Sequence, residues 1–272
     1  MYRCSSTLRP AALAFLAVFV PTLEGRAAET VRRVPEQYPN IQAAVDAAQP
    51  GDPIRVGRGS WCGATVTKRV KLVGRDGARI VGCAAPVLST DLRIGFFLPD
   101  GQSSGTTIRN FTFDGRGVSN AHLAPLAFGI FARQADNVTV ADNRVLGTVQ
   151  AITNTGGSGW HVAGNVVEGL TAFTCEGRCG GGDAIVFQQR DVSLPRASNN
   201  VAVRNDIRGR IPDGLDEFSM VGILVLGQEG AVVLANQLAI PANRRAEGDG
   251  QGIVVTDHCC GCLLYTSPSP RD

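Results

Sequence analysis

The chain has 272 residues, a formal net charge of +2 and a hydrophobic fraction of 44%, which is enough to bury a core. The small charge, and the lack of basic clusters interleaved with aromatic residues, argue against a nucleic-acid partner. The length allows one or two domains. Frequent Val and Ile punctuated by Gly and Asn favour many short strands joined by tight corners.

The N-terminus has the organisation of a secretory signal peptide. Arg3 and Arg9 form a positively charged region before the apolar run Ala11 to Val20, and Gly25-Arg26-Ala27 offers small residues for cleavage. We therefore expect residues 1–27 to be removed, with cleavage after Ala27 or Ala28, and the mature protein to be secreted or periplasmic. A retained anchor is the weaker alternative, because the run is too short to span a bilayer comfortably. No membrane contact beyond the signal peptide is expected.

An amphipathic helix is predicted next. Asn40 is a good N-cap, Pro50-Gly51 ends the segment, and one helical face is apolar, formed by Ile41, Ala44, Val45 and Ala48. Only strand patterns follow this helix. It is therefore expected to be a lid over the open end of a β-structure, where free strand edges would otherwise pair with other chains.

Short strands are predicted at Ile54–Val56, Ala64–Val66, Val70–Gly74 and Ala78–Gly82. Cys62 and Cys83 are about one coil length apart if these strands wind into a parallel coil. Stacked strands lie about 4.8 Å apart, within the range that a disulfide bridges. We expect a disulfide between neighbouring coils; the alternative is two independent buried thiols.

A degenerate repeat runs through the rest of the chain. Its first half is a small residue followed by Ile, as in Gly129-Ile130, Ala151-Ile152, Ala184-Ile185, Gly222-Ile223 and Gly252-Ile253. Its second half is apolar-x-Val-x-x-Asn-x-apolar, as in Val138 to Val145, Trp160 to Val167 and Ala231 to Leu238, with two copies (Ile108 to Phe113 and Val203 to Ile207) one residue short. A repeated unit made only of strands predicts a β-solenoid. The asparagines are expected to stack at one corner as a hydrogen-bonded ladder rather than to act in catalysis; they are Asn110, Asn143, Asn165, Asn205 and Asn236.

The segment from Tyr38 to Gly261 resembles the right-handed parallel β-helix proteins of the pectin-lyase-like superfamily. The helix motif Asn-Ile-Gln-Ala-Ala-Val-Asp-Ala-Ala and the Gly-Asp-Pro-Ile-Arg-Val that follows it are similar to the N-terminal cap and first strand of that superfamily. The predicted fold class is therefore all-β, a right-handed parallel β-helix with a short N-terminal capping helix. The domain is expected to cover residues 28–261 and to be incomplete at its C-terminus.

The last residues, 262–272, resemble the translation of a transposase adapter used in sequencing libraries. We expect this tail to be artefactual; a natural disordered Ser/Pro tail is the alternative. His258, Cys259 and Cys260 stand just before it. They are interpreted either as half of a disulfide whose partner is missing or as a metal cluster that Cys262 would complete.

Long insertions interrupt the later repeats after Val167, Ile207 and Leu238, and equivalent insertions in a solenoid emerge on one face. They collect acids and arginines, which would suit an acidic polysaccharide held by arginine forks or bridged by Ca²⁺. Ordinary solvated loop charges are the alternative interpretation. The candidate substrate-binding residues are Arg208, Arg244 and Arg245. The first of these insertions also contains Cys175 and Cys179, for which a local disulfide is favoured over a redox or metal motif.

The resemblance implies a mechanism of uronate lyases, in which a basic residue removes the proton α to a carboxyl group beside Asp-bound Ca²⁺. Arg190 or Arg210 would be the base, and the metal ligands would be Asp183, Asp213 and Asp216. Asp213, Asp216 and Glu217 could also supply a general acid and base for hydrolysis. The chain lacks the motifs expected of polygalacturonases and pectin methylesterases.

Two functions are carried forward. The first is an exported, monomeric protein that binds or processes an acidic polysaccharide through these loops. The second is a non-catalytic periplasmic or surface binding or scaffold protein. A further possibility is that a chain with an uncovered last coil does not fold.

Overall fold

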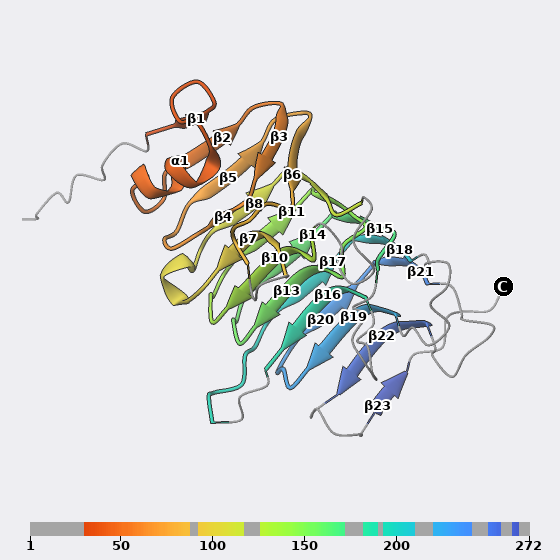
Figure 1. Ribbon diagram of the computed structural model, residues 1–272. Helices are drawn as coiled ribbons and strands as arrows, with labels where there is room; N and C mark the ends of the chain where they lie inside the picture. Colours follow the sequence, from red (N-terminus) through yellow and green to blue (C-terminus); the bar gives the residue numbers. More distant parts are fainter. Residues whose placement is uncertain are drawn as a thin grey trace, which may run out of the picture.

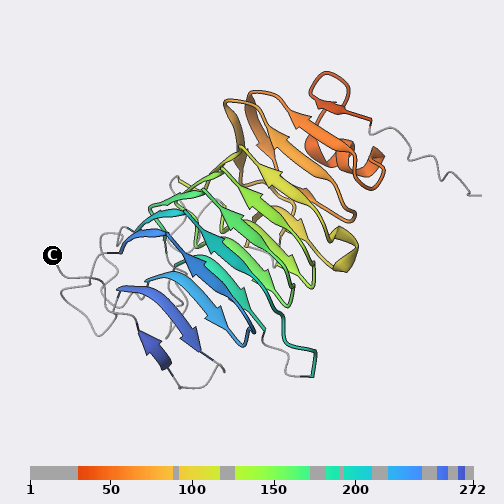
Figure 2. The same ribbon diagram turned by 180° about the vertical axis from the view of Figure 1, so that it is seen from behind.

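A computed structural model describes residues 30–87, 92–116, 126–171, 182–189, 193–209, 220–240 and 250–256, and the backbone of 263–266. Within these ranges the protein is a parallel β-solenoid whose strands stack along one axis (Figures 1 and 2). The order sheet A, sheet B, sheet C repeats seven times from β2 to β22. The predicted all-β solenoid is confirmed, and no helix in these ranges is long and apolar enough to cross a membrane.

Sheet A contains β1 (Arg32–Val34), β2 (Pro53–Val56), β5 (Lys71–Gly74), β8 (Thr107–Arg109), β11 (Thr139–Ala141), β14 (His161–Ala163), β17 (Val201–Val203) and β20 (Val232–Leu234). Sheet B contains β3 (Gly59–Cys62), β6 (Ala78–Val81), β9 (Thr112–Asp114), β12 (Arg144–Leu146), β15 (Val166–Glu168), β18 (Asp206–Arg208) and β21 (Gln237–Ala239). Sheet C contains β4 (Ala64–Thr65), β7 (Ile94–Leu98), β10 (Phe128–Arg133), β13 (Gln150–Thr155), β16 (Asp183–Gln188), β19 (Met220–Leu226), β22 (Gly250–Thr256) and β23 (Leu263–Thr266). A helix α1 (Ile41–Ala47) and a 3₁₀ turn η1 (Gly101–Ser103) complete the elements.

The interior of the solenoid is built from rows of apolar side chains, one row from each sheet. In sheet C the row is the predicted one, because Ile130, Ile152, Ile185, Ile223 and Ile253 are in register in successive strands. The row continues backwards through Phe96 to Ala64, which the repeat did not predict. Each such side chain is worth about 1.5–3 kcal/mol when fully buried, so the rows hold neighbouring coils together.

The residue before each of these interior side chains of sheet C is small for a steric reason. A Cβ on Gly129 would lie 2.6 Å from the carbonyl oxygen of Ala151 in the next coil, and one on Gly95 would lie 2.4 Å from that of Gly129. Adjacent coils therefore approach each other closely along this row, which accounts for the small-Ile pattern in the sequence.

Four asparagines form the expected ladder at the corner between sheets A and B. The side-chain Oδ1 of Asn165 accepts from the backbone N–H and the side-chain Nδ2 of Asn143, both at 3.0 Å. Asn205 accepts in the same way from Asn165, and Asn236 from Asn205. Each Nδ2 also donates to a backbone carbonyl of the preceding coil. The ladder thus satisfies buried backbone groups at a corner where strand pairing is interrupted.

The prediction was wrong for Asn110. Ile108 is in register with Val140, so Phe111 occupies the ladder position and donates its backbone N–H to Oδ1 of Asn143 at 3.0 Å. Asn110 instead has a left-handed backbone, with φ of 62°, as does Asp142 in the next coil. The left-handed residue is therefore the one before the ladder position.

The two copies of the repeat described as one residue short have the ordinary length. In the second of them Ala202, rather than Val203, is in register with Val162, which restores the usual spacing to Asn205.

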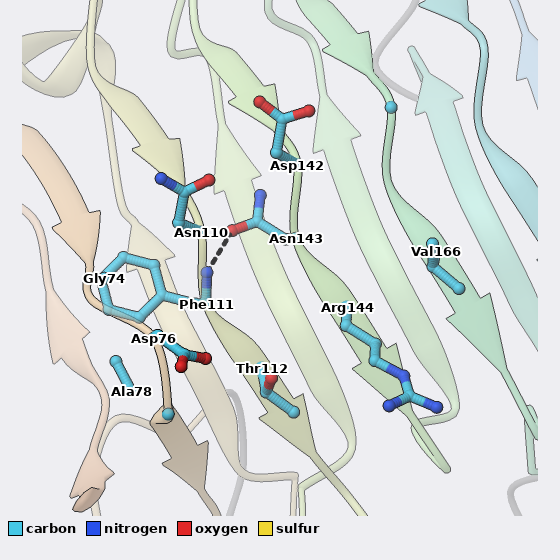
Figure 3. A pocket seen from close by; sticks show the side chains of 12 residues that line it. Gly74, Asp76, Ala78, Asn110, Phe111, Thr112, Asp142, Asn143, Arg144 and Val166 are labelled. Carbon is cyan, nitrogen blue, oxygen red and sulfur yellow. Dashed lines mark hydrogen bonds between the residues drawn. The ribbon is translucent and has the colours of Figure 1, made fainter. Parts of the chain in front are cut away.

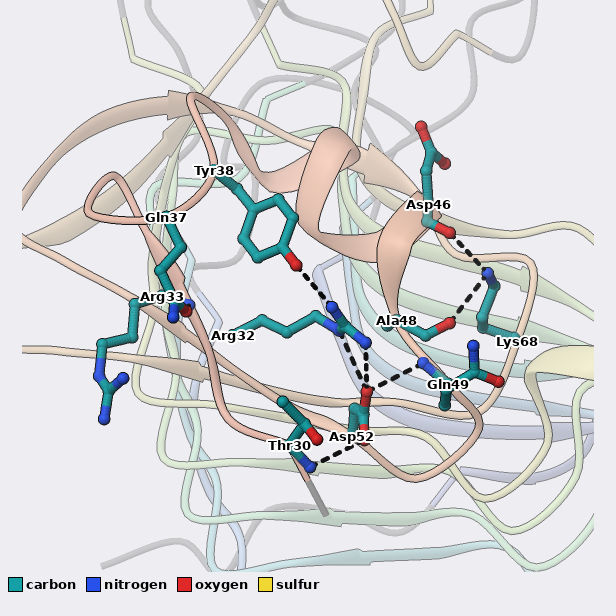
Figure 4. Close-up of polar contacts among 10 residues, drawn as sticks. All are labelled: Thr30, Arg32, Arg33, Gln37, Tyr38, Asp46, Ala48, Gln49, Asp52 and Lys68. Carbon is teal, nitrogen blue, oxygen red and sulfur yellow. Dashed lines mark hydrogen bonds and ion pairs between the residues drawn. The ribbon is translucent and has the colours of Figure 1, made fainter. Parts of the chain in front are cut away.

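A buried ion pair fastens the N-terminal strand to the loop after α1 (Figure 4). Arg32 of β1 donates to Oδ2 of Asp52 from Nε at 3.1 Å and from Nη2 at 2.9 Å, and its Nη1 donates to the Tyr38 hydroxyl. The backbone N–H groups of Gln49 and Thr30 donate to the same carboxylate. Burial opposes ionisation of Asp52, but these donors and the Arg32 charge outweigh it and lower the pKa of that carboxyl. The sequence did not predict β1.

Helix α1 begins as predicted. The Asn40 side chain accepts from the backbone N–H of Ala43 at 2.8 Å, and Ile41, Ala44 and Val45 are buried. The helix contacts β1, β2 and β4. At its other end, Nζ of Lys68 donates to the carbonyls of Asp46 and Ala48 at 3.0 and 3.2 Å (Figure 4).

The disulfide between Cys62 and Cys83 is confirmed, with a Cα–Cα distance of 5.5 Å. Cys62 ends β3, and Cys83 follows β6, its neighbour in sheet B. The bridge therefore links two adjacent coils. Cys175 and Cys179 lie outside the described residues, as do Cys259, Cys260 and Cys262.

The backbone of Leu263–Thr266, within the tail set apart in the sequence, pairs with β22 as the antiparallel strand β23. This pairing was not predicted. All other strand pairs of the three sheets are parallel.

Candidate functional site

The long insertions leave the solenoid at equivalent places in three consecutive coils. They connect β15 to β16, β18 to β19 and β21 to β22. The first strands of these pairs are neighbours in sheet B, and the second strands are neighbours in sheet C. All three therefore belong to the corner between sheets B and C. In the coil before them, residues 147–149 suffice to connect β12 to β13.

Most of the predicted site residues lie outside the described residues. Those in the three connections are Arg210, Asp213, Asp216, Glu217, Arg244 and Arg245, whereas Arg190 follows β16 in the chain and so belongs to none of these connections. Only Asp183 and Arg208 can be placed. Asp183 opens β16 in sheet C, and Arg208 ends β18 in sheet B, so they flank the same corner from different sheets.

Both placed residues already have partners. Gln150 Nε2 donates to Oδ2 of Asp183 at 2.9 Å. Arg208 Nε donates to Oδ1 of Asp206 at 3.1 Å, and this hydrogen bond raises the pKa of the Arg208 guanidinium. The Arg208 side chain is still 60% exposed, so it retains donors for a ligand.

The outer face of sheet B contains a network of arginines and carboxylates that the sequence analysis did not identify. Its central group is Asp114, whose side chain is 9% exposed and contacts two arginines. Arg116 donates from Nε to Oδ1 at 2.9 Å and from Nη2 to Oδ2 at 3.0 Å. Nη1 of Arg79, on the neighbouring strand β6, lies 3.2 Å from Oδ2. Hydrogen bonding from Arg116 is the main cause of the lowered pKa of Asp114, and the Arg79 charge adds to it.

Two simpler pairs extend this network to later coils. Arg144 of β12 donates to Oε2 of Glu168 on β15 at 2.8 Å. Arg208 pairs with Asp206 on its own strand. Such exposed pairs contribute little to stability, about 0–1 kcal/mol each. Together the described face presents four arginines and three carboxylates. The alternation of inward and outward side chains in strands could have shown this, once the register of sheet B was known.

A polar groove of about 510 Å³ lies at the corner between sheets A and B, where the asparagine ladder is (Figure 3). This is the end of the sheet B strands opposite to the insertions. Exposed side chains of Asn110, Asp142 and Arg144 line it, and Asp76 lies at its edge in the loop after β5. Its carboxylates only accept hydrogen bonds and the Arg144 guanidinium only donates them, so the groove suits groups that can do both, such as hydroxyls. The Arg144 side chain stands between this groove and the charged face of sheet B.

The outer face of sheet C is apolar near β7 and β10. Phe131 packs edge-on against Phe128, with ring centroids 5.1 Å apart, and Arg133 lies 5.8 Å from the ring centroids of both Phe131 and Phe97. This cluster is separate from the solenoid interior. Toward the insertions the face becomes polar, with Thr153 donating to Gln150 at 2.7 Å and Gln150 to Asp183.

The described residues do not by themselves make a calcium site. They contain no group of three or more His, Cys, Asp or Glu residues placed to hold a metal ion. Of the three predicted ligands, Asp183 alone can be placed, and one of its oxygens already accepts from Gln150. Asp213 and Asp216 lie outside the described residues.

Comparison of the chain with protein families, with curated proteins and with solved structures found no match.

Proposed function

We propose that this protein binds an acidic polysaccharide along the corner between sheets B and C. The observation that carries the proposal is the emergence of three long insertions at that corner in consecutive coils, where arginines and acids are concentrated in the sequence. Neighbouring coils repeat at about 4.8 Å, so equivalent groups recur along the axis as charged groups recur along a polymer. Arginine suits this role because its planar fork binds carboxylates in a bidentate manner.

Three further features belong to this proposal. The solenoid would be a right-handed helix of the pectin-lyase-like type, with α1 as the lid of its first coil. The protein would be exported, which is consistent with a disulfide between Cys62 and Cys83. It would act as a monomer.

Turnover of the polymer by a lyase or hydrolase mechanism is the stronger form of the proposal. It assigns the base to Arg190 or Arg210 and the acidic roles to Asp213, Asp216 and Glu217, with Ca²⁺ held by Asp183 and the two aspartates. An arginine base requires a substrate proton acidified by a metal, because the guanidinium pKa is above about 12. The alternative is a non-catalytic binding or scaffold protein, for which the supporting observation is that the three described acids of sheet B are each paired with arginine.

A panel of uronate polymers tests the proposal. Binding would be measured by affinity electrophoresis, and cleavage by the absorbance of unsaturated products with and without Ca²⁺. We expect retardation by at least one polyuronate, and at least a fivefold weaker interaction in the double variant R244Q/R245Q. Arg55→Gln is the matched control, since Arg55 is exposed on sheet A away from this corner. Absence of binding across the panel, or equal losses in control and double variant, would refute the proposal; binding without cleavage would support the non-catalytic form.

A further inference from the structure

The group formed by Arg79, Asp114 and Arg116 differs from the other ion pairs of sheet B in its charge balance. Arg144 and Arg208 each have a carboxylate of their own, whereas Arg79 and Arg116 share one. Counted by direct ion pairs, the group therefore carries a net charge of one positive unit, although the Glu168 carboxylate also acts on Arg116 and, after Asp114, helps to raise the pKa of its guanidinium. Because Asp114 has a lowered pKa, it remains ionised at neutral pH and the excess charge stays with the two guanidiniums.

The shared carboxylate holds both arginines in place while leaving them accessible. Both oxygens of Asp114 accept hydrogen bonds from Arg116. Oδ1 accepts from Nε and from the backbone N–H, the latter at 3.1 Å, and Oδ2 accepts from Nη2. The arginine side chains nevertheless remain 49% and 59% exposed. Each guanidinium has five N–H donors; Arg116 uses two on Asp114, and Arg79 approaches it with one nitrogen. The other donors are available to a ligand.

The backbone around Arg116 is closely packed, which restricts where its side chain can lie. A Cβ on Gly115 would lie 2.6 Å from the carbonyl oxygen of Gly147 and 2.7 Å from that of Leu126. Gly147 itself has a positive φ of 61°, which favours glycine at this contact. Both arginines are held by a buried carboxylate, and the tight turn further restricts Arg116, so they lose little conformational entropy when they bind.

We infer that Arg79 and Arg116 form an oxyanion-binding subsite on the outer face of sheet B, suited to the carboxylate or sulfate group of a polysaccharide. The polymer part of this inference rests on the proposed function. Arg79 lies on β6 and Arg116 directly follows β9, three and two coils before the insertion between β15 and β16, so the site would extend the binding surface along the solenoid axis. Asp114 is a positioning residue within it.

The experiment is a titration of the full chain with inorganic sulfate and with monomeric galacturonate, at constant ionic strength, followed by NMR or calorimetry. Arg79→Gln and Arg116→Gln should each raise the Kd at least tenfold. Arg109→Gln, which removes an exposed arginine from sheet A in the same coil, should change it less than twofold. The two probes distinguish the sources of the oxyanion, because a preference for sulfate indicates a sulfated polymer and a preference for galacturonate a uronate.

Asp114→Asn separates a built site from diffuse positive charge. The variant gains one positive unit, so simple charge attraction predicts tighter binding. A positioned arginine pair predicts weaker binding, because the group that holds it is lost. Tighter binding in Asp114→Asn, equal effects of Arg79→Gln and Arg109→Gln, or no binding of either probe would overturn the inference. If Asp114→Asn does not fold, as judged by its melting curve, the two arginine variants decide.

The outcomes also separate this inference from the proposed function. If R244Q/R245Q weakens polyuronate binding and the Arg79 and Arg116 variants do not, the subsite is wrong and the proposed function stands. If sulfate or galacturonate binds through Arg79 and Arg116 while no polymer binds, the subsite stands and the proposed function is wrong.

Discussion

Replacing Asn165 by alanine should be far more costly than the same change at Asn236, the last rung of the ladder. Asn165 is fully buried and sits between two other rungs. Its Oδ1 accepts the backbone N–H of Asn143, and its Nδ2 donates to the carbonyl of Val140 at 2.9 Å. Alanine leaves both buried backbone groups without these partners, at about 1–3 kcal/mol each. With the lost contacts between amides, we expect a destabilisation of about 4 kcal/mol, a large fraction of a typical total of about 5–15 kcal/mol.

Asn236 is only partly buried, although it also accepts two hydrogen bonds from Asn205. Water can replace its amide, so Asn236→Ala should cost about 1 kcal/mol. Equilibrium urea unfolding followed by circular dichroism would compare the two variants with the parent, and an unchanged slope would confirm that stability alone has changed. Losses that agree within about 0.5 kcal/mol, or a larger loss at Asn236, would show that the ladder does not act by satisfying buried backbone groups.

Three further changes probe other parts of the fold. Asp52→Asn leaves the largely buried Arg32 guanidinium without its carboxylate partner and should cost about 3 kcal/mol. The pKa of Asp52 lies below its ordinary value of 3.8, so the stability that its carboxylate contributes is complete above that pH and is lost as the pH falls further. Melting temperatures should therefore fall less steeply from pH 6 to pH 2.5 in the variant than in the parent. Parallel curves would contradict this. Cys62→Ser opens the loop to Cys83 and should cost about 3 kcal/mol by chain entropy. The urea midpoint measures the loss, and Cys83→Ser should give the same shift; a change below about 1 kcal/mol would count against this. Phe187→Ala removes a fully buried ring and should cost about 3–5 kcal/mol; a loss near zero in the same unfolding assay would show that this coil is not part of the cooperative core.

The sequence predicted the parts of the fold that repeat. Ile130 and its equivalents are in register because each coil must bury one branched side chain at the same place, and a one-residue slip would turn the row outward. The same reasoning failed at Asn110 because it aligned residues by type. The register is fixed by the interior Ile108, and a phenylalanine at the ladder position, Phe111, can still donate its backbone N–H to Asn143.

The arginine and carboxylate group on sheet B could not be predicted in this way. Arg79 and Arg116 are unremarkable in the sequence, and Asp114 comes from a different strand than Arg79. Their association depends on a register between β6 and β9 that spans an insertion of irregular length. The charges of the insertions cluster along the chain and are therefore visible in the sequence, whereas those of sheet B cluster only in space.

The solenoid architecture also determines how far the structural effect of a substitution on sheet B should extend. Each coil packs only on its neighbours, and the arginines of sheet B point away from the interior rows that hold the coils together. Removing Arg79 should therefore leave the rows of sheet C unchanged, since an exposed ion pair contributes about 0–1 kcal/mol. Asp114 is different, because it is buried and its loss leaves two guanidiniums without their shared partner. A binding defect in the arginine variants can thus be attributed to the ligand contact itself, while a defect in Asp114→Asn requires the melting curve beside it before it is assigned to positioning.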